Sequence, residues 1–180
     1  IEPTCEFNNR SGMATSSRKK AIELWQTQIP LGDREQLAKM LFCVDNPPGT
    51  VNISGAQDQL GILMPGLNKL NFNNSYWPHS IESDCTEETL NYVQEHLYLM
   101  PLKPRLNGYD VFANKNVNPE SIKKLAASAE VCWKAIKYRD TRAWGEATSR
   151  CLDAQLEMFP SMATDELLEM RKRYEKQIYG

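Results

Sequence analysis

The amino-acid sequence predicts an α+β protein made of two parts. Three observations support this prediction: short β-type runs mix with helical patterns before residue 85, Pro- and Gly-containing segments separate them, and helical spacing of apolar residues dominates after residue 118. A chain of 180 residues has room for one sizeable domain or two small ones. We therefore place a boundary near residue 85.

Two helices and three short strands are expected in the first part. The first helix covers residues 16–28. The second covers residues 33–42, with Asp33 as its N-cap and Gln36 three residues later, as in a capping box. Paired prolines and a Gly then end the helical pattern. Short β-type runs predict strands at residues 51–54, 68–72 and 77–83.

One strand and four helices are expected in the second part. The apolar run at residues 96–102 is the best strand candidate in the sequence. A long helix starts with Pro119 in its first position, where the missing N–H group costs nothing. The other helices are predicted at residues 87–95, 144–154 and, after Thr164 as a cap, 167–178.

Composition excludes several classes of function. The formal net charge is −2 and the pI is about 5.8, so the basic surface that nucleic-acid binding needs is missing. No apolar run approaches the roughly 20 residues of a membrane-spanning helix. Five scattered cysteines without a C-x-x-C pair, and only two histidines, argue against a zinc site or a disulfide framework. We expect free thiols in a reducing cytoplasm, with neither a nucleic-acid nor a membrane partner.

The segment from Gly12 to Ser17 precedes the first predicted helix and has the composition of a phosphate-binding loop. It combines a Gly, small residues and three consecutive hydroxyl side chains. Backbone N–H groups at a helix start favour phosphate, and hydroxyls can add hydrogen bonds or bind Mg²⁺. A plain Ser or Thr N-cap is the commoner explanation of such a segment when it is taken alone. Both interpretations stay open on these residues alone.

A second segment places an acid in a Gly-flanked turn. Asp58 lies between Gln57 and Gln59, with Gly55 before it and Gly61 after it. A carboxylate on a tight turn can accept a proton from a substrate hydroxyl, and the neighbouring amides can orient it or the substrate. The alternative is an Asx-type turn or a helix N-cap.

Together, the two segments resemble motifs of the GHMP kinases, the superfamily of galactokinase, homoserine kinase and mevalonate kinase. The phosphate loop of that superfamily is G-L-G-S/T-S-S/A, and Gly12-Met13-Ala14-Thr15-Ser16-Ser17 is similar, with Met for Leu and Ala for the second Gly. Its sugar kinases carry a G-x-x-D-Q loop, which Gly55-Ala56-Gln57-Asp58-Gln59 resembles. The stretch QDQLGILMPGLNKL is closest to the heptose-phosphate and fucose kinases.

The resemblance implies a GHMP-kinase-like two-domain α+β fold. Residues 1–85 would form part of the ribosomal-protein-S5-like N-terminal domain, and residues 86–180 part of the ferredoxin-like helical C-terminal domain. The family's first strands should precede Ile1, and its late glycine-rich motif should follow Gly180. We therefore expect the chain to be an incomplete, internal portion of such a kinase.

The resemblance also implies an activity: transfer of the γ-phosphoryl group of ATP to a hydroxyl of a sugar or sugar phosphate, such as a heptose phosphate or fucose. Asp58 would be catalytic, and Gly12 to Ser17 would hold the nucleotide phosphates. Ser16 or Thr15 would lie near Mg²⁺, and Gly55, Gln57 and Gln59 would bind the sugar. The cofactors would be ATP and Mg²⁺ and the location cytoplasmic, while homodimer formation stays open.

Two other functions remain compatible with the sequence. The chain could be a catalytically silent nucleotide- or sugar-binding protein with a kinase-like fold, which would bind a ligand without releasing ADP. It could also be an interaction module whose helical part docks a partner and whose two segments are simple helix caps.

Overall fold

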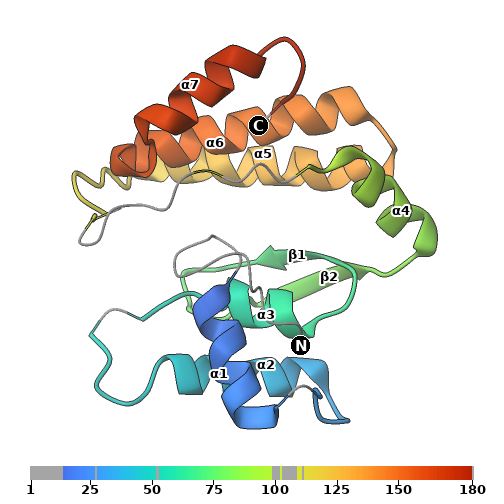
Figure 1. The fold of residues 1–180 in the computed structure, drawn as a ribbon, viewed down its shortest axis with the longest axis vertical. Helices are drawn as coiled ribbons and strands as arrows, with labels where there is room; N and C mark the ends of the chain where they lie inside the picture. Colours follow the sequence, from blue (N-terminus) through green and yellow to red (C-terminus); the bar gives the residue numbers. More distant parts are fainter. Residues whose placement is uncertain are drawn as a thin grey trace. The chain divides into compact units, whose positions relative to one another are not determined.

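A computed structural model describes residues 14–26, 28–51, 53–98, 102, 109–110 and 112–179 (Figure 1). The chain divides into two compact units, Ile1–Thr86 and Glu87–Gly180, which we call unit 1 and unit 2. The described residues are mostly helical and include a small antiparallel sheet, so the α+β class is confirmed. The division falls within two residues of the boundary that the sequence predicts.

The elements follow in a simple order. Unit 1 contains α1 (Thr15–Trp25), α2 (Arg34–Asp45), α3 (Gln57–Leu63), β1 (Leu67–Asn71) and β2 (Ser80–Asp84). Unit 2 contains α4 (Glu87–His96), α5 (Pro119–Lys137), α6 (Thr141–Met158), a 3₁₀ turn (Pro160–Met162) and α7 (Asp165–Tyr174).

The core of unit 1 joins α2 and α3 to the hairpin. Asp33 caps α2 as predicted, because its carboxylate accepts hydrogen bonds from the backbone N–H groups of Glu35 and Gln36 at 2.8 and 3.2 Å. β1 and β2 pair antiparallel, with Leu70 opposite Ile81. The buried core residues are Leu37, Ala38, Ala56, Leu60 and Leu63, and Leu70, Trp77 and Ile81 are among the apolar side chains packed against them.

Unit 2 is built on the antiparallel pair of α5 and α6, which lie side by side in Figure 1. Asn118 caps α5 by accepting the N–H of Ser121 at 3.0 Å. Small buried residues on the two helices, among them Ser128, Ala147 and Ala154, let the helices approach closely.

The flanking helices of unit 2 are attached by polar contacts. The hydroxyl of Tyr92 on α4 lies 2.8 Å from Thr141 Oγ1 at the start of α6. At the other end of the unit, Thr164 caps α7 as predicted, and Arg171 of α7 forms an ion pair with Asp153 of α6 at 2.6 Å. No residue of α7 is fully buried, and Leu167, Met170 and Tyr174 are its half-buried apolar side chains.

Two predicted strands are wrong in the described residues. Val51, Ile53 and Ser54 form no strand, and Val51 is 92% exposed. The second strand was expected over residues 96–102, but its first residue, His96, ends α4, and Leu97 and Tyr98 are not paired in a sheet. β-type residues form a strand only where a neighbouring strand offers backbone partners, and the described sheet ends with β1 and β2. Residues 99–101 lie outside the described part.

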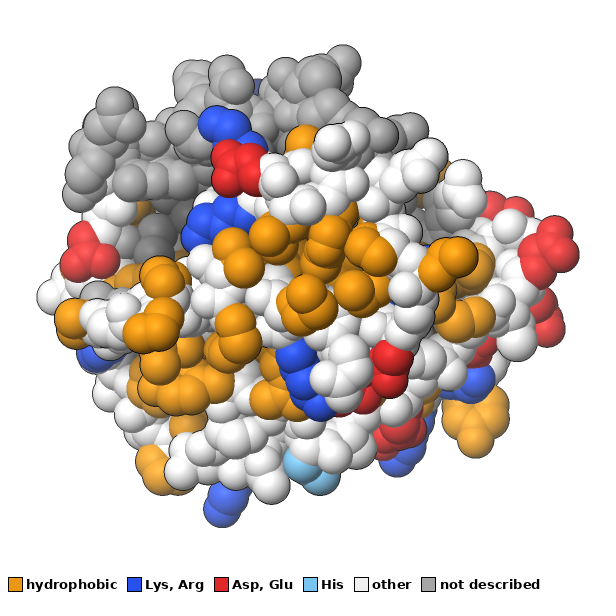
Figure 2. All heavy atoms as spheres, turned by 90° about the horizontal axis from the view of Figure 1, so that it is seen from below, with side chains coloured by type: hydrophobic (Ala, Val, Ile, Leu, Met, Phe, Trp, Pro, Cys, Tyr) orange, Lys and Arg blue, Asp and Glu red, His pale blue; other side chains and the backbone are white. Residues whose placement is uncertain are grey.

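Unit 1 leaves some apolar side chains on its surface. Met40 and Val44 lie one turn apart on α2 and are 54% and 39% exposed. Figure 2 shows a broad area of hydrophobic side chains on the face seen from below. Apolar atoms supply more than half of an ordinary protein surface, so exposure of this kind does not by itself indicate a ligand.

Candidate functional site

The first helix begins without a side-chain cap. Its N-cap residue is Ala14, whose side chain cannot accept a hydrogen bond, so the Ser or Thr N-cap interpretation of this segment is wrong. Ser16 is exposed and Ser17 is 5% exposed. Gly12 and Met13 lie outside the described residues, and of Thr15 only the backbone is described. The N–H groups of the first turn have no partner within their own helix, which is the condition for anion binding.

Ala14 adopts the left-handed backbone conformation, with φ 54° and ψ 33°. A side chain in that region costs roughly 1–2 kcal/mol, and Gly adopts it freely. The Ala in place of the family's Gly therefore stands at a position that needs positive φ.

We expect Ala14→Gly to raise the free energy of unfolding of unit 1 by about 0.5–1 kcal/mol. The relief of backbone strain exceeds the added flexibility of the unfolded chain. Urea unfolding measures the change. Ala129→Gly, at an exposed site inside α5, is the matched control and should lower stability by about 1 kcal/mol. A loss of stability in both variants would contradict the prediction.

Asp58 lies in the first turn of α3 and not in a loop. The N-cap of this helix is Ala56, so the alternative in which Asp58 itself is the N-cap is wrong. Neither Gly55 nor Gly61 has a positive φ, and a Cβ added at either position would meet nothing within 4 Å. The backbone therefore does not require Gly at these two positions. Their small size instead leaves open space on both sides of Asp58.

Gln59 joins the two sequence segments. Its side chain is 1% exposed, and its Nε2 group lies 3.4 Å from Ser17 Oγ of α1, across 42 positions of sequence. The same Nε2 group donates a hydrogen bond to Asp45 Oδ2 at the end of α2. Asp45 also forms an ion pair with Lys20 of α1 at 2.9 Å, and its side chain is only 6% exposed. One buried amide and one carboxylate thus tie α1, α2 and α3 together.

The amide of Gln59 is only partly satisfied. Its carbonyl oxygen, Oε1, is buried and has no hydrogen-bond partner in the described part of the chain. A buried acceptor left unpaired costs about 1–3 kcal/mol. Such an atom indicates that a donor from a ligand or from water belongs beside it.

The carboxyl group of Asp58 has a raised pKa. Partial burial is the largest cause, the negative charge of Asp45 raises it further, and Arg18 opposes the shift. Asp45 and Arg18 are therefore close enough to Asp58 for their charges to act on it. Sequence reasoning missed Asp45, because the residue looks like an ordinary acid at the end of a helix and only the fold brings it to Asp58.

No family model, curated protein or solved structure matches this chain. The resemblance to GHMP kinases therefore depends on the two motifs themselves. What the structure adds is their placement: Ser17 of the first motif and Gln59 of the second are in contact, and Asp58 lies one position before Gln59.

The raised pKa of Asp58 predicts a pH dependence of stability. In the folded state this group binds its proton more tightly than in the unfolded state, so the folded state is favoured at low pH. The contribution is lost as the pH rises from the ordinary value of 3.8 through the folded-state pKa. The unfolding free energy of the chain, minus that of Asp58→Asn, should fall across this window. Urea titrations between pH 3 and pH 7 test it, and a difference that rises with pH would contradict it.

The described residues carry no preformed metal cluster. No group of three or more His, Cys, Asp or Glu side chains in the described ranges is arranged to hold a metal ion. Mg²⁺ differs from other metals here, because it is commonly held by one or two carboxylates together with the phosphates of a substrate. Asp45 is a carboxylate of this kind near Asp58, since its charge acts on the Asp58 carboxyl group.

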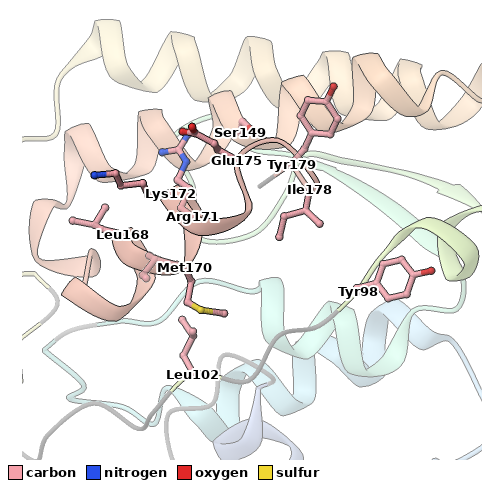
Figure 3. A pocket seen from close by; sticks show the side chains of 11 residues that line it. Tyr98, Leu102, Ser149, Leu168, Met170, Arg171, Lys172, Glu175, Ile178 and Tyr179 are labelled. Carbon is pink, nitrogen blue, oxygen red and sulfur yellow. The ribbon is translucent and has the colours of Figure 1, made fainter.

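Unit 2 contains a hollow that is lined by no residue of the two sequence motifs. It has a volume of about 590 Å³ and lies beside α7, with Leu168, Met170 and Ile178 among the side chains that line it (Figure 3). Of its two cationic residues, Arg171 and Lys172, the first is paired with Asp153. Within the described helices, none is long and apolar enough to cross a membrane.

Proposed function

We propose that this chain carries the catalytic core of an ATP-dependent sugar kinase of the GHMP type. The observation that supports this most strongly is the contact between Gln59 and Ser17 at 3.4 Å. The proposed phosphate-binding segment at the start of α1 and the acidic segment at the start of α3 are separate motifs in the sequence. A kinase needs its phosphate-binding and acidic groups close together.

The start of α1 binds the nucleotide phosphates in this proposal. The backbone N–H groups that follow Ala14 and the helix dipole attract negative charge. Arg18 and Lys20 add positive charge on the same helix, although Lys20 is engaged with Asp45 in this structure. The exposed hydroxyl of Ser16 offers a further hydrogen bond. Gly12 and Met13 complete the motif outside the described residues.

Asp58 accepts the proton of the sugar hydroxyl. The hydroxyl oxygen forms a bond to the γ-phosphorus while the bond from that phosphorus to the bridging oxygen of ADP breaks. Positioning and charge neutralisation supply most of the rate in such transfers. A raised pKa makes Asp58 a stronger base than an ordinary aspartate. Gln59 holds α3 against α1 and so positions Asp58. This role suits the nearly complete burial of the Gln59 side chain better than a direct contact with the sugar.

Mg²⁺ would be held by Asp45 and Ser16 together with the phosphates, and it would neutralise the charge that builds up on them. In this structure Asp45 is shared between Lys20 and Gln59. The carboxylate would therefore exchange part of these contacts for the ion when the nucleotide binds.

The same proposal gives the finer description of the fold. Units 1 and 2 would be parts of the N-terminal and C-terminal domains of a GHMP kinase, and the location would be cytoplasmic. The acceptor would be a heptose phosphate, fucose or a related monosaccharide.

ADP release tests the proposal directly. The chain and its Asp58→Asn variant are incubated with Mg-ATP and a panel of monosaccharides and sugar phosphates. Asp165→Asn, at an exposed carboxylate of α7, is the matched control. Thermal unfolding with Mg-ATP provides a second measurement, since ligand at a hundred times its Kd stabilises a protein by about 2.7 kcal/mol.

Sugar-dependent ADP release that Asp58→Asn abolishes and Asp165→Asn preserves would support a sugar kinase and identify its acceptor. Nucleotide binding without ADP release in any protein of the series would favour the catalytically silent binding protein. Absence of nucleotide binding throughout would overturn the kinase proposal and leave the interaction module.

A further inference from the structure

A second hollow lies next to the candidate site in unit 1. It has a volume of about 410 Å³, within the range of small-molecule pockets. One wall consists of Gly55 and Gln57, directly before Asp58 in the sequence. The other wall consists of residues from the turn between β1 and β2, namely Phe72, Asn74, Ser75 and Tyr76.

The side chains around this hollow combine aromatic surface with neutral hydrogen-bonding groups. Phe72 and Tyr76 are 39% and 58% exposed, although aromatic rings are usually buried in the core of a domain. Gln57 and Asn74 are exposed amides that can both donate and accept hydrogen bonds. A sugar ring matches such a lining, because it has an apolar C–H face and a rim of hydroxyl groups. A phosphate does not match it, since none of the six lining residues is cationic.

The turn that carries the aromatic wall is well defined. Asn74 has a φ of 67°, a left-handed conformation that Asn adopts more readily than most residues. The hydroxyl of Ser75 donates a hydrogen bond to the carbonyl oxygen of Trp77. Trp77 is anchored in turn, because its ring packs on the core and its Nε1 donates to Glu35 at 3.2 Å. Tyr76 therefore stands on a turn that the core holds in place.

We propose that this hollow binds the sugar ring of the acceptor as a neutral monosaccharide, with Tyr76 stacked on the ring and Gln57 and Asn74 bonded to its hydroxyls. The inference rests on the proposed kinase function. It narrows the acceptor to a free sugar and assigns the β1–β2 turn as the element that selects it.

A steric variant tests the placement without disturbing the fold. A Cβ added at Gly55, a residue that lines the hollow, would meet no atom within 4 Å, so Gly55→Val should fold normally and narrow the hollow at this wall. We expect it to abolish detectable sugar binding while Mg-ATP binding stays within about twofold. Tyr76→Ala should weaken sugar binding about five- to tenfold, as the loss of one aromatic stacking contact does. Tyr76→Phe should restore it, because the ring provides the contact.

The probes are fucose, galactose and mannose, compared with their phosphate esters, in equilibrium binding to the chain. Tyr138→Ala removes an 82% exposed Tyr in unit 2 and should change nothing. Sugar binding that survives Gly55→Val and Tyr76→Ala would overturn the subsite, as would a preference for the phosphate esters or no sugar binding at all. Because Mg-ATP binding is measured separately, a chain that binds nucleotide but fails these tests refutes the subsite alone.

Discussion

Asp58→Asn should lower the rate of sugar phosphorylation by about 10²- to 10⁴-fold, the usual contribution of a positioned general base. The amide keeps the size of the carboxylate and cannot take up the proton of the acceptor hydroxyl. Because Asp58 lies in the first turn of α3, and the proposed phosphate contacts come from α1, the affinity for Mg-ATP should change little. Initial rates of ADP release measure the loss of activity, and the Kd of Mg-ATP, determined on the same preparations, measures the nucleotide affinity.

The pH–rate profile provides an independent check on this assignment. The kcat/KM profile reports the free protein, in which burial and Asp45 raise the pKa of Asp58, so the acidic limb of that profile should lie above the ordinary aspartate value of 3.8. The residual activity of Asp58→Asn should lack that limb. Unchanged turnover in the variant, or an unchanged acidic limb, would remove Asp58 from the chemistry.

Local signals made most of the helices predictable. The carboxylate of Asp33 and the apolar spacing behind it gave the start of α2, and Pro119 with its following apolar stripe gave α5. These signals act within one or two turns, because a cap bonds to N–H groups only two or three residues away. The hairpin was predictable for the same reason, since its two β-type runs are separated by a short polar turn.

The failures occur where distant residues decide the outcome. Residues 51–54 and 96–98 have β-type side chains and no strand to pair with, and sequence periodicity does not report the presence of a partner. The positive φ of Ala14 could not be predicted from the sequence either, since Ala ordinarily avoids this backbone conformation.

The candidate site was predictable in its residues and not in its arrangement. The motifs singled out Ser17 and Asp58, yet the contact of Ser17 with Gln59 and the influence of Asp45 on Asp58 arise from the packing of three helices. Gln59 shows the difference most clearly. Its place beside Asp58 suggests a sugar contact, and only the fold shows that its side chain is 1% exposed.

Gly66→Ala should lower the free energy of unfolding of unit 1 by about 2–5 kcal/mol, a large part of the 5–15 kcal/mol that stabilises a typical domain. Two costs add at this position. The φ of Gly66 is 78°, where a side chain costs about 1–2 kcal/mol. An added Cβ would also lie 2.5 Å from the carbonyl oxygen of Asp84 and 2.7 Å from Cys85 Sγ. The carbonyl is backbone, so relief requires the strand itself to move, at about 1–3 kcal/mol.

The clash matters because Gly66 leads into β1 beside the end of β2. Leu67 pairs with Asp84 in the hairpin, and Asp84 is buried and accepts hydrogen bonds from Thr86. Gly49→Ala separates the two costs: Gly49 has a φ of 92°, but its added Cβ would meet nothing within 4 Å. We expect it to lose only the conformational part, about 1–2 kcal/mol. Urea unfolding of both variants measures the difference between their losses of stability. Equal losses would mean that β2 moves away from the new methyl group without a loss of free energy, which would contradict the prediction for Gly66.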